Sequence, residues 1–187
     1  MTQVLTRKMT REEYLEFERH SQERYEYVNG ELVKREMPKL KHELIIKNLI
    51  VLLEFLLKGK PFTVVPCGMK IDIESFGNYR YADVSVVPRE NMDLESDILS
   101  NAVVLFEVSS KSTANVDRGE KFDEYQTLPS LREYVLVSAE KVQVELFRRK
   151  SRNEWDYVVL DDKAMKLELQ SIGATLSLTD IYEGTKL

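Results

Sequence analysis

The residues best suited to chemistry are two acids set inside apolar strands and a lysine that follows them. Asp83 lies within residues 79–87, Glu107 lies within residues 103–109, and Lys121 lies in the helical segment that comes next. A buried carboxylate is costly unless positive charge compensates it. Two such acids close in the sequence indicate a shared counter-charge, and a divalent metal ion is the simplest candidate.

The geometry of a β-strand predicts where these acids point. Side chains alternate along a strand, so Asp83 shares a face with Ser85 and Glu107 shares a face with Leu105. If the two strands are neighbours in register, the carboxylates converge. Two carboxylates at close range either bind a divalent cation or share a proton.

The lysine supplies a third part of a hydrolytic site. Lys121 lies on the helix that leaves the Glu107 strand, and a helix packed back over the sheet can direct the ammonium group toward the strand ends. A cation there would stabilise a phosphoryl transition state or orient an attacking water. Metal-assisted hydrolysis needs acids that hold metal, a cation near the phosphoryl oxygens and an activated water.

Simpler structural interpretations of the same residues stay open. Asp83 could pair with Arg80 or cap the end of its strand, and Glu107 could be a buried acid paired with a lysine. Lys121 has the i,i+4 spacing for an ion pair with Asp117 on a solvated helix face. Spacing alone does not decide between these interpretations and a metal site.

The overall charge limits the classes of function. The chain has 187 residues, 43% of them hydrophobic, and a net charge of −5. We expect one globular domain over residues 1–187. The negative charge argues against a protein that coats nucleic acid through its global field. A nuclease remains compatible, because a local basic surface could offset it. One basic cluster, Arg148–Lys150 with Arg152, is more simply a solvated hairpin end.

The single cysteine and the apolar stretches bear on location. Cys67 has no internal disulfide partner, which fits a reducing compartment, so we expect a cytoplasmic protein. The longest apolar stretch, residues 44–57, is interrupted by Lys47, Asn48 and Glu54, so no membrane span is expected.

The order of elements predicts a mixed α/β fold with one central sheet flanked by helices. Thr10 and Glu13 have capping-box spacing at the start of a helix, and Asn29-Gly30 is typical of a tight hairpin turn. The expected helices and helical turns are 10–20, 39–58, 117–125 and 179–182. The expected strands are 24–28 and 31–34 of a hairpin at 24–36, then 62–73, 79–87, 102–109, 133–138, 141–147, 155–160 and 166–169. Residues 88–101 are expected to form a loop.

An ordered set of motifs across residues 10–150 resembles a known family. The motifs are Arg24–Glu31, His42, Tyr81–Val84, Glu107–Thr113, Asp117–Phe122 with Tyr125, and Pro129–Val137. Together they resemble the Uma-two family of restriction-endonuclease-like proteins, within the PD-(D/E)XK nuclease superfamily. The resemblance implies a restriction-endonuclease-like fold, with a central mixed sheet, flanking helices and an N-terminal helix and hairpin.

The resemblance also implies roles for the three residues named first. Asp83 and Glu107 match the two motif acids that hold Mg²⁺ or Mn²⁺. The usual superfamily lysine lies two residues after the second acid, where this chain has Ser109. Lys121 matches a family pattern in which the lysine has moved to the next helix, and Lys111 is the rival for that role.

Two further residues match the family pattern and leave alternatives open. Glu31 matches an acid of the early hairpin, for which a further metal ligand and an edge-strand salt bridge are both open. His42 matches a family histidine at the start of the long helix, where catalysis and a capping or core hydrogen bond are both open. Ala82 replaces the proline before the first acid, and alanine fits the same extended backbone.

The expected function is metal-dependent hydrolysis of phosphodiester bonds in DNA. The alternative is a catalytically inactive nuclease-fold domain that acts as a DNA-binding, protein-binding or assembly module. A homodimer is a further expectation, because enzymes that cut both DNA strands often use two copies. The strands at 142–147 and 155–160 would offer an edge for such pairing.

Overall fold

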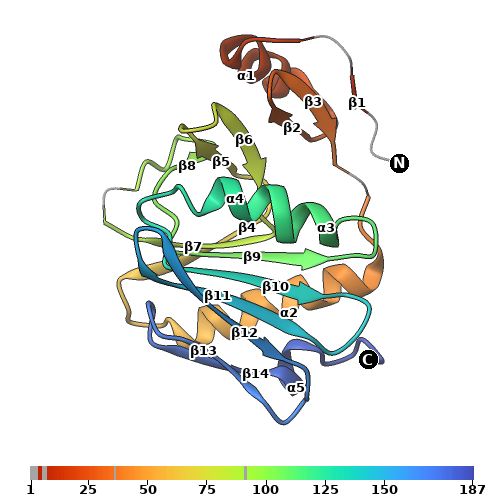
Figure 1. Ribbon diagram of the computed structural model, residues 1–187, viewed down its shortest axis with the longest axis vertical. Helices are drawn as coiled ribbons and strands as arrows, with labels where there is room; N and C mark the ends of the chain where they lie inside the picture. The colour runs from red at the N-terminus through yellow and green to blue at the C-terminus, as the bar shows by residue number, and fades with distance from the viewer. Residues whose placement is uncertain (1–3, 6–7, 36, 91) are drawn as a thin grey trace.

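The strands of the chain form two six-stranded sheets and one two-stranded sheet (Figure 1). The computed structural model describes residues 4–5, 8–35, 37–90 and 92–187. Residue 36, at the end of the predicted hairpin, and residue 91, in the predicted loop, lie outside this description. No helix in the described ranges is long and apolar enough to cross a membrane.

The first six-stranded sheet carries the N-terminal hairpin. Its order is β1 (Val4–Leu5), β3 (Glu31–Lys34), β2 (Tyr25–Val28), β6 (Asn78–Tyr81), β5 (Lys70–Ile73) and β8 (Ile98–Leu99). The predicted tight turn is present, because Asn29 and Gly30 have φ angles of 51° and 87°.

Helix α1 (Arg11–His20) packs on this sheet. It begins with the predicted capping box of Thr10 and Glu13. Its fully buried Tyr14 ring stacks against Tyr27 at 5.2 Å and Tyr79 at 5.5 Å between centroids. These rings fix the hairpin against β6.

The second six-stranded sheet is the predicted mixed sheet. Its order is β12 (Glu154–Leu160), β11 (Val144–Ser151), β10 (Glu133–Ser138), β9 (Val104–Ser109), β7 (Val84–Pro88) and β4 (Phe62–Pro66). Strands β9 and β10 are parallel and the other neighbours are antiparallel. The crossover between β9 and β10 contains α3 (Ala114–Val116), a π-helical turn η1 (Asp117–Lys121) and α4 (Phe122–Tyr125).

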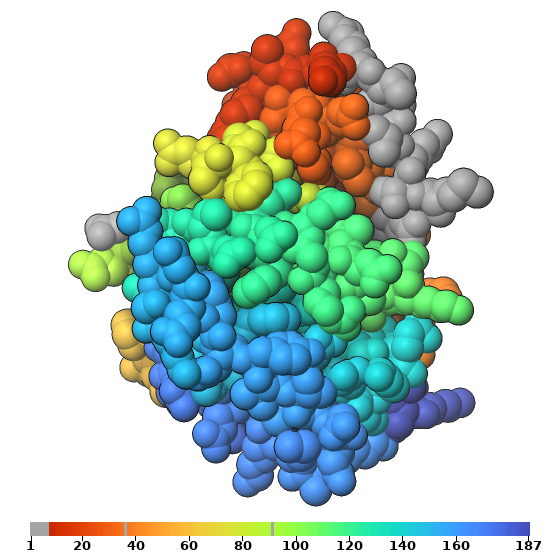
Figure 2. Space-filling view, viewed as in Figure 1, coloured from red at the N-terminus to blue at the C-terminus, as the bar shows by residue number. Residues whose placement is uncertain are grey.

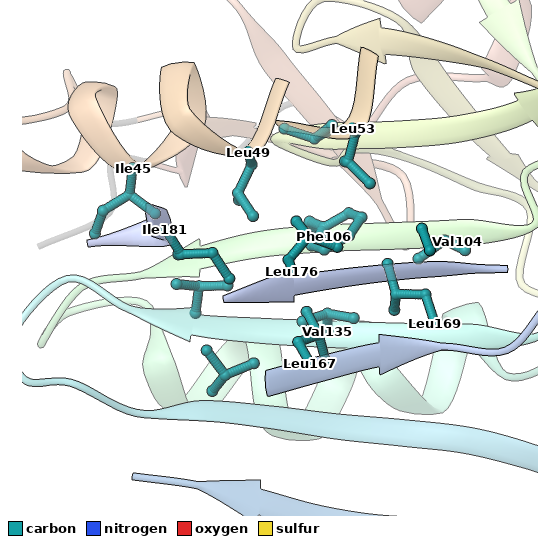
Figure 3. Packing of buried hydrophobic residues seen from close by; sticks show 14 of the residues in the cluster. Ile45, Leu49, Leu53, Val104, Phe106, Val135, Leu167, Leu169, Leu176 and Ile181 are labelled. Carbon is teal, nitrogen blue, oxygen red and sulfur yellow. The ribbon is translucent and has the colours of Figure 1, made fainter. Parts of the chain in front are cut away.

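The mixed sheet has a hydrophobic cluster on each face. On one face, helix α2 (Leu40–Leu56), the hairpin of β13 (Lys166–Leu169) and β14 (Ala174–Ser177), and α5 (Leu178–Ile181) cover the sheet. Leu49 of α2 and Phe106 of β9 are both fully buried in this cluster (Figure 3). On the other face, Leu105 and Tyr134 pack beneath α4 with Tyr125. Alternation along β9 therefore directs Glu107 to the α4 side.

Two predicted strands each divide between the two sheets. The expected strand 62–73 is β4 and β5, separated by a turn in which Gly68 has a φ angle of 124°. The expected strand 79–87 is β6 and β7, separated at Ala82 and Asp83. At each of these breaks the chain passes between the mixed sheet and the first sheet, called the hairpin sheet below. The expectation of one sheet was wrong for this reason.

Smaller differences concern element boundaries. Residues 88–101, expected as a loop, include the short strand β8. The strand expected at 141–147 begins at Val144 and continues to Ser151. Strand β14 and the π-helical turn within residues 117–125 had no expected counterpart.

The role of α2 in the core can be tested with a matched pair of variants. Leu49→Ala should lower the free energy of unfolding by about 2–5 kcal/mol, because Leu49 is fully buried beneath the mixed sheet. Val51→Ala on the same helix should change it by less than about 0.5 kcal/mol, because Val51 is 61% exposed. Urea unfolding followed by circular dichroism measures both, and equal losses would contradict the packing described.

Candidate active site

The two predicted acids lie close together where β7 pairs with β9. Asp83 immediately precedes β7, and Glu107 lies within β9. Strands β7 and β9 pair Val84 with Phe106, and the Asp83 N–H donates to the Phe106 carbonyl at 3.0 Å. The Asp83 carboxylate accepts the Val108 N–H, so Asp83 contacts the backbone on both sides of Glu107. The structure thus brings together the two predicted acids.

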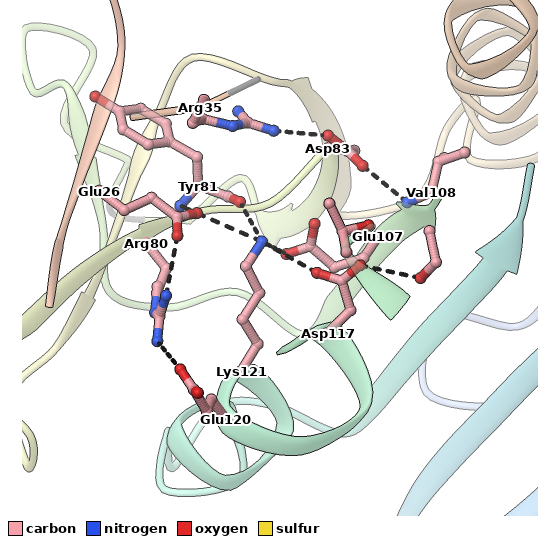
Figure 4. A network of polar contacts seen from close by, with 12 residues as sticks. Glu26, Arg35, Arg80, Tyr81, Asp83, Glu107, Val108, Asp117, Glu120 and Lys121 are labelled. Atoms are coloured by element: carbon pink, nitrogen blue, oxygen red, sulfur yellow. Dashed lines mark hydrogen bonds and ion pairs between the residues drawn. The ribbon is translucent and has the colours of Figure 1, made fainter. Parts of the chain in front are cut away.

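Asp83 is held by three donors. One carboxylate oxygen accepts the Val108 backbone N–H at 2.8 Å, and the other accepts from the Arg35 guanidinium at 2.9 Å (Figure 4). The Nε2 atom of His42, in the first turn of α2, lies 3.4 Å from the oxygen that Val108 contacts. Asp83 is only 3% exposed, so these contacts compensate a buried charge.

Glu107 is bound by the crossover segment. Its Oε1 atom accepts from Lys121 Nζ at 2.9 Å and from the Tyr125 hydroxyl at 3.1 Å. Lys121 also lies 3.4 Å from Glu26 and 3.5 Å from Asp117. The lysine therefore joins three buried carboxylates, one from β9, one from β2 and one from its own turn.

The π-helical turn explains how one short segment directs two charged residues inward. Asp117 and Lys121 open and close η1, and both are buried. A π-turn widens the helix locally and is often found at functional sites. The predicted Lys121–Asp117 pair is present, but it lies in the buried network rather than on a solvated face.

Glu26, Arg80 and Glu124 extend the network away from Lys121. Arg80 is 2% exposed and contacts Glu26 at 3.0 Å and Glu124 at 2.7 Å. The predicted alternative in which Arg80 pairs with Asp83 is therefore not what the structure shows, since Arg35 takes that place. The name acidic network is used below for the buried carboxylates and the cations that contact them. Its carboxylates are Glu26, Asp83, Glu107, Asp117 and Glu124, and its cations are Arg35, Arg80 and Lys121.

Sequence reasoning missed Glu26 and Arg35. Glu26 had a readable signal, because it stands between Tyr25 and Tyr27 in a short strand and must face away from them. Arg35 had none, because it lies 48 positions from Asp83 in the sequence.

The other candidates occupy different positions. Glu31 opens β3 across from Val28 and, among the described residues, forms no ion pair with the acidic network, whereas Glu26 of the same hairpin does. His42 lies beside Asp83 as described above. Lys111 is exposed in the turn after β9, while Lys121 is buried against Glu107.

Comparison with known proteins places this chain in a family. A family described as "Uma2: Putative restriction endonuclease" matches residues 11–179. The chain belongs to the Uma2 family. Two uncharacterised proteins of Synechocystis sp. are similar to it. The protein slr1290 is 32% identical over 180 residues, which cover 95% of this chain and 93% of that protein. The protein sll1609 is 28% identical over 157 residues, which cover 83% and 89%.

A solved structure shares the fold. It is described as a "putative nuclease belonging to DUF820 from Anabaena variabilis ATCC 29413". Its TM-score to this chain is 0.79 at 15% identity, with 95% of this chain and 99% of that chain covered. The predicted family and the predicted mixed α/β fold are therefore confirmed.

In this Uma2 chain the pKa values of Asp83 and Glu107 are shifted in opposite directions. Burial alone would raise the pKa of Asp83, but His42 and Arg35 outweigh it and lower the pKa to about 2. Burial raises the pKa of Glu107 to about 8; the Asp83 and Asp117 carboxylates add to this rise and Lys121 opposes it. Asp83 is thus ionised at neutral pH, while Glu107 keeps its proton until the pH approaches about 8.

Lys121 remains a cation in this Uma2 chain. Burial alone would lower its pKa, but Glu107, Glu26 and Asp117 outweigh burial and raise the pKa above its ordinary value. The ammonium group therefore keeps its proton at neutral pH. It can supply positive charge and hydrogen bonds, but it cannot serve as a general base.

The donor set fits a divalent metal in its chemistry and its charge. The acidic network contains five buried carboxylates, Glu26, Asp83, Glu107, Asp117 and Glu124. Its permanent cations are three, Arg35, Arg80 and Lys121. Within the described ranges no three His, Cys, Asp or Glu side chains are grouped as a complete metal cage. Mg²⁺ commonly takes one or two carboxylates and fills its remaining positions with water and phosphate oxygens.

The raised pKa of Glu107 predicts a pH dependence of stability. Protonated Glu107 stabilises the fold, so this contribution is complete below its ordinary pKa of 4.5 and is lost as the pH rises through about 8. Between about pH 5 and pH 9, in chelator, the wild type should lose at least about 1.4 kcal/mol of unfolding free energy relative to Glu107→Gln, one pKa unit's worth. Urea unfolding at each pH measures the difference, and a constant difference would contradict the shift.

Proposed function

We propose that this Uma2 protein is a metal-dependent nuclease that hydrolyses phosphodiester bonds in DNA, with Asp83, Glu107 and Lys121 as its active-site residues. The observation that carries the proposal is that Asp83 hydrogen-bonds to the backbone on both sides of Glu107, with the Lys121 ammonium 2.9 Å from Glu107. Membership of a family described as "Putative restriction endonuclease" supports the same chemistry.

Asp83 and Glu107 would hold Mg²⁺ or Mn²⁺. When bound, the metal supplies a Lewis acid that polarises a phosphoryl oxygen and lowers the pKa of a coordinated water. Asp83 already carries the charge needed for this role, because its pKa is lowered to about 2. Glu107 must lose its proton to act as a ligand, so binding should weaken as the pH falls below about 8.

Lys121 acts through charge and hydrogen bonding. It is a permanent ammonium group beside the second acid, where it can donate to an attacking water or to a phosphoryl oxygen that gains negative charge. Its three carboxylate neighbours fix its position, so little reorganisation is needed at the moment of reaction. A fixed donor of this kind typically contributes 10²–10³ in rate, as an order-of-magnitude value.

Arg35 and His42 lie on the more accessible side of the site. Their side chains are 26% and 16% exposed, whereas that of Asp83 is 4% exposed. Both contribute positive charge to Asp83, and the partly exposed Arg35 guanidinium has donors that suit a phosphate oxygen. We infer that substrate approaches from this side.

One observation favours the alternative of a binding module without catalysis. Both motif acids already have protein cations as partners, Arg35 and His42 on Asp83 and Lys121 on Glu107. A domain kept only for binding would use these pairs as permanent structural contacts. The two functions differ in whether bound DNA is cleaved.

Plasmid cleavage with millimolar Mn²⁺ or Mg²⁺ separates the two functions. The wild-type protein should convert supercoiled plasmid to nicked or linear DNA. Asp83→Asn, Glu107→Gln and Lys121→Met should each lower the rate at least about 100-fold, because each removes a metal ligand or the fixed cation.

Two matched controls complete this experiment. Lys111→Met and Glu54→Gln change an exposed lysine after β9 and an exposed acid of α2, and both should keep the wild-type rate within about twofold. Loss of cleavage in Lys111→Met with full activity in Lys121→Met would reverse the lysine assignment. Equal background cleavage in the wild type and Asp83→Asn would establish the binding module instead.

A further inference from the structure

A groove lined by positive charge lies outside the acidic network, beside the C-terminal end of α4. It has a volume of about 790 Å³ and lies between residues 123–132 and the β11–β12 hairpin, which border each other in Figure 2. Four of its lining side chains are cationic and one is acidic: Arg132, Arg149, Lys150 and Arg152, and Asp123. This surface is called the cationic groove, and it belongs to a chain whose net charge is −5.

Arg149 is fixed at the base of the cationic groove. Its guanidinium donates to the Leu131 carbonyl at 2.7 Å and the Gln126 carbonyl at 2.7 Å, and it stacks on the Trp155 ring at 4.3 Å from the centroid. A β-bulge in β11 between Arg149 and Ser151 changes the direction of the strand here. Carbonyl partners hold the guanidinium in place without neutralising its charge.

Three of the four cations lack an acidic partner. In the part of the chain that the structure describes, Arg132, Arg149 and Arg152 form no ion pair, whereas Lys150 pairs with Asp156 at 2.7 Å. Arg132 donates to the Pro129 carbonyl at 2.8 Å. Burial and the charge of the nearby Arg132 both lower the pKa of Arg149. Like charges held together without a counter-ion favour binding of an anion.

We propose that the cationic groove binds the phosphate backbone of DNA. Exposed Arg132 and Arg152 present planar guanidinium groups, which match the geometry of phosphate oxygens. Gln126 and Asn153 add neutral donors along the same surface. Arg149 serves as a fixed positive charge beneath them. The choice of DNA as the polyanion rests on the proposed function, while the phosphate site rests on the groove itself.

The cationic groove lies beside the same helical segment that carries Lys121 of the acidic network. Lys121 and Gln126 are five residues apart on the same helical segment, which corresponds to about 8 Å along its axis. On its other side the cationic groove adjoins a smaller hollow of about 350 Å³ that is lined by Asp72 and Glu74 and shares Ser75. Asp72 is paired with Arg11 at 2.8 Å, so Glu74 is the acid that repels phosphate and limits the DNA-binding surface in that direction.

Metal-free binding to a fluorescein-labelled DNA duplex, measured by anisotropy over a series of salt concentrations in chelator, tests the proposal. The Arg132→Ala, Arg152→Ala double variant should bind at least about tenfold more weakly. The slope of log affinity against log salt should fall by about 1.8, because two phosphate contacts are lost. The matched control Lys58→Ala, Lys166→Ala removes the same charge from exposed positions outside the groove and should bind as the wild type does.

Two further arms make the outcome unambiguous. The Arg132→Lys, Arg152→Lys variant keeps the charge and should retain most of the affinity, which excludes a folding defect as the cause of the loss. Inorganic pyrophosphate should compete with DNA only weakly, because its two phosphate groups make fewer contacts than the many phosphates of a DNA backbone. Wild-type affinity and salt slope in the alanine variant, or an equal loss in the lysine control, would overturn the proposal. Cleavage by the wild type, lost in Asp83→Asn, tests the proposed nuclease separately.

Discussion

The hydrogen bond from the Lys121 ammonium to Glu107 is the contact on which the site depends. It joins the crossover segment to the centre of the mixed sheet, and Lys121 extends it to Glu26 of the hairpin sheet. Removal of a buried cation typically costs several kcal/mol, because the charges it faced stay buried. The network nevertheless holds more carboxylates than permanent cations. That excess is destabilising in the protein alone and is what a divalent cation would neutralise.

The fold creates this excess by moving the chain between two sheets. Asp83 lies at the point where β6 of the hairpin sheet gives way to β7 of the mixed sheet. Its backbone still pairs with Phe106, while its side chain meets Arg35 and His42 from elements that lie outside the mixed sheet. The first acid is therefore positioned by strand pairing and charged by contacts that the hairpin and α2 supply. The second acid has Lys121 as its cation, but burial and the Asp83 and Asp117 carboxylates outweigh it and raise its pKa.

Local signals in the sequence predicted most elements and the face of the sheet toward which Glu107 points. The capping box at Thr10, the turn at Asn29 and alternation along the Glu107 strand each depend on neighbouring residues, and the structure has all three. The division of residues 62–73 and 79–87 between sheets depends on which distant strands they pair with, so local signals did not predict it. Arg35 was missed for the same reason. Glu26 was not predicted, because the family pattern favoured Glu31 of the same hairpin.

The central claim is that the space between Asp83 and Glu107 is a divalent cation site, and anomalous diffraction from a crystal soaked in millimolar Mn²⁺ tests it most directly. The account predicts an anomalous peak within bonding distance of both carboxylates, with the Arg35 guanidinium moved away from Asp83. A well-ordered crystal without that peak, in which Arg35 still pairs with Asp83 and Lys121 with Glu107, would contradict the claim.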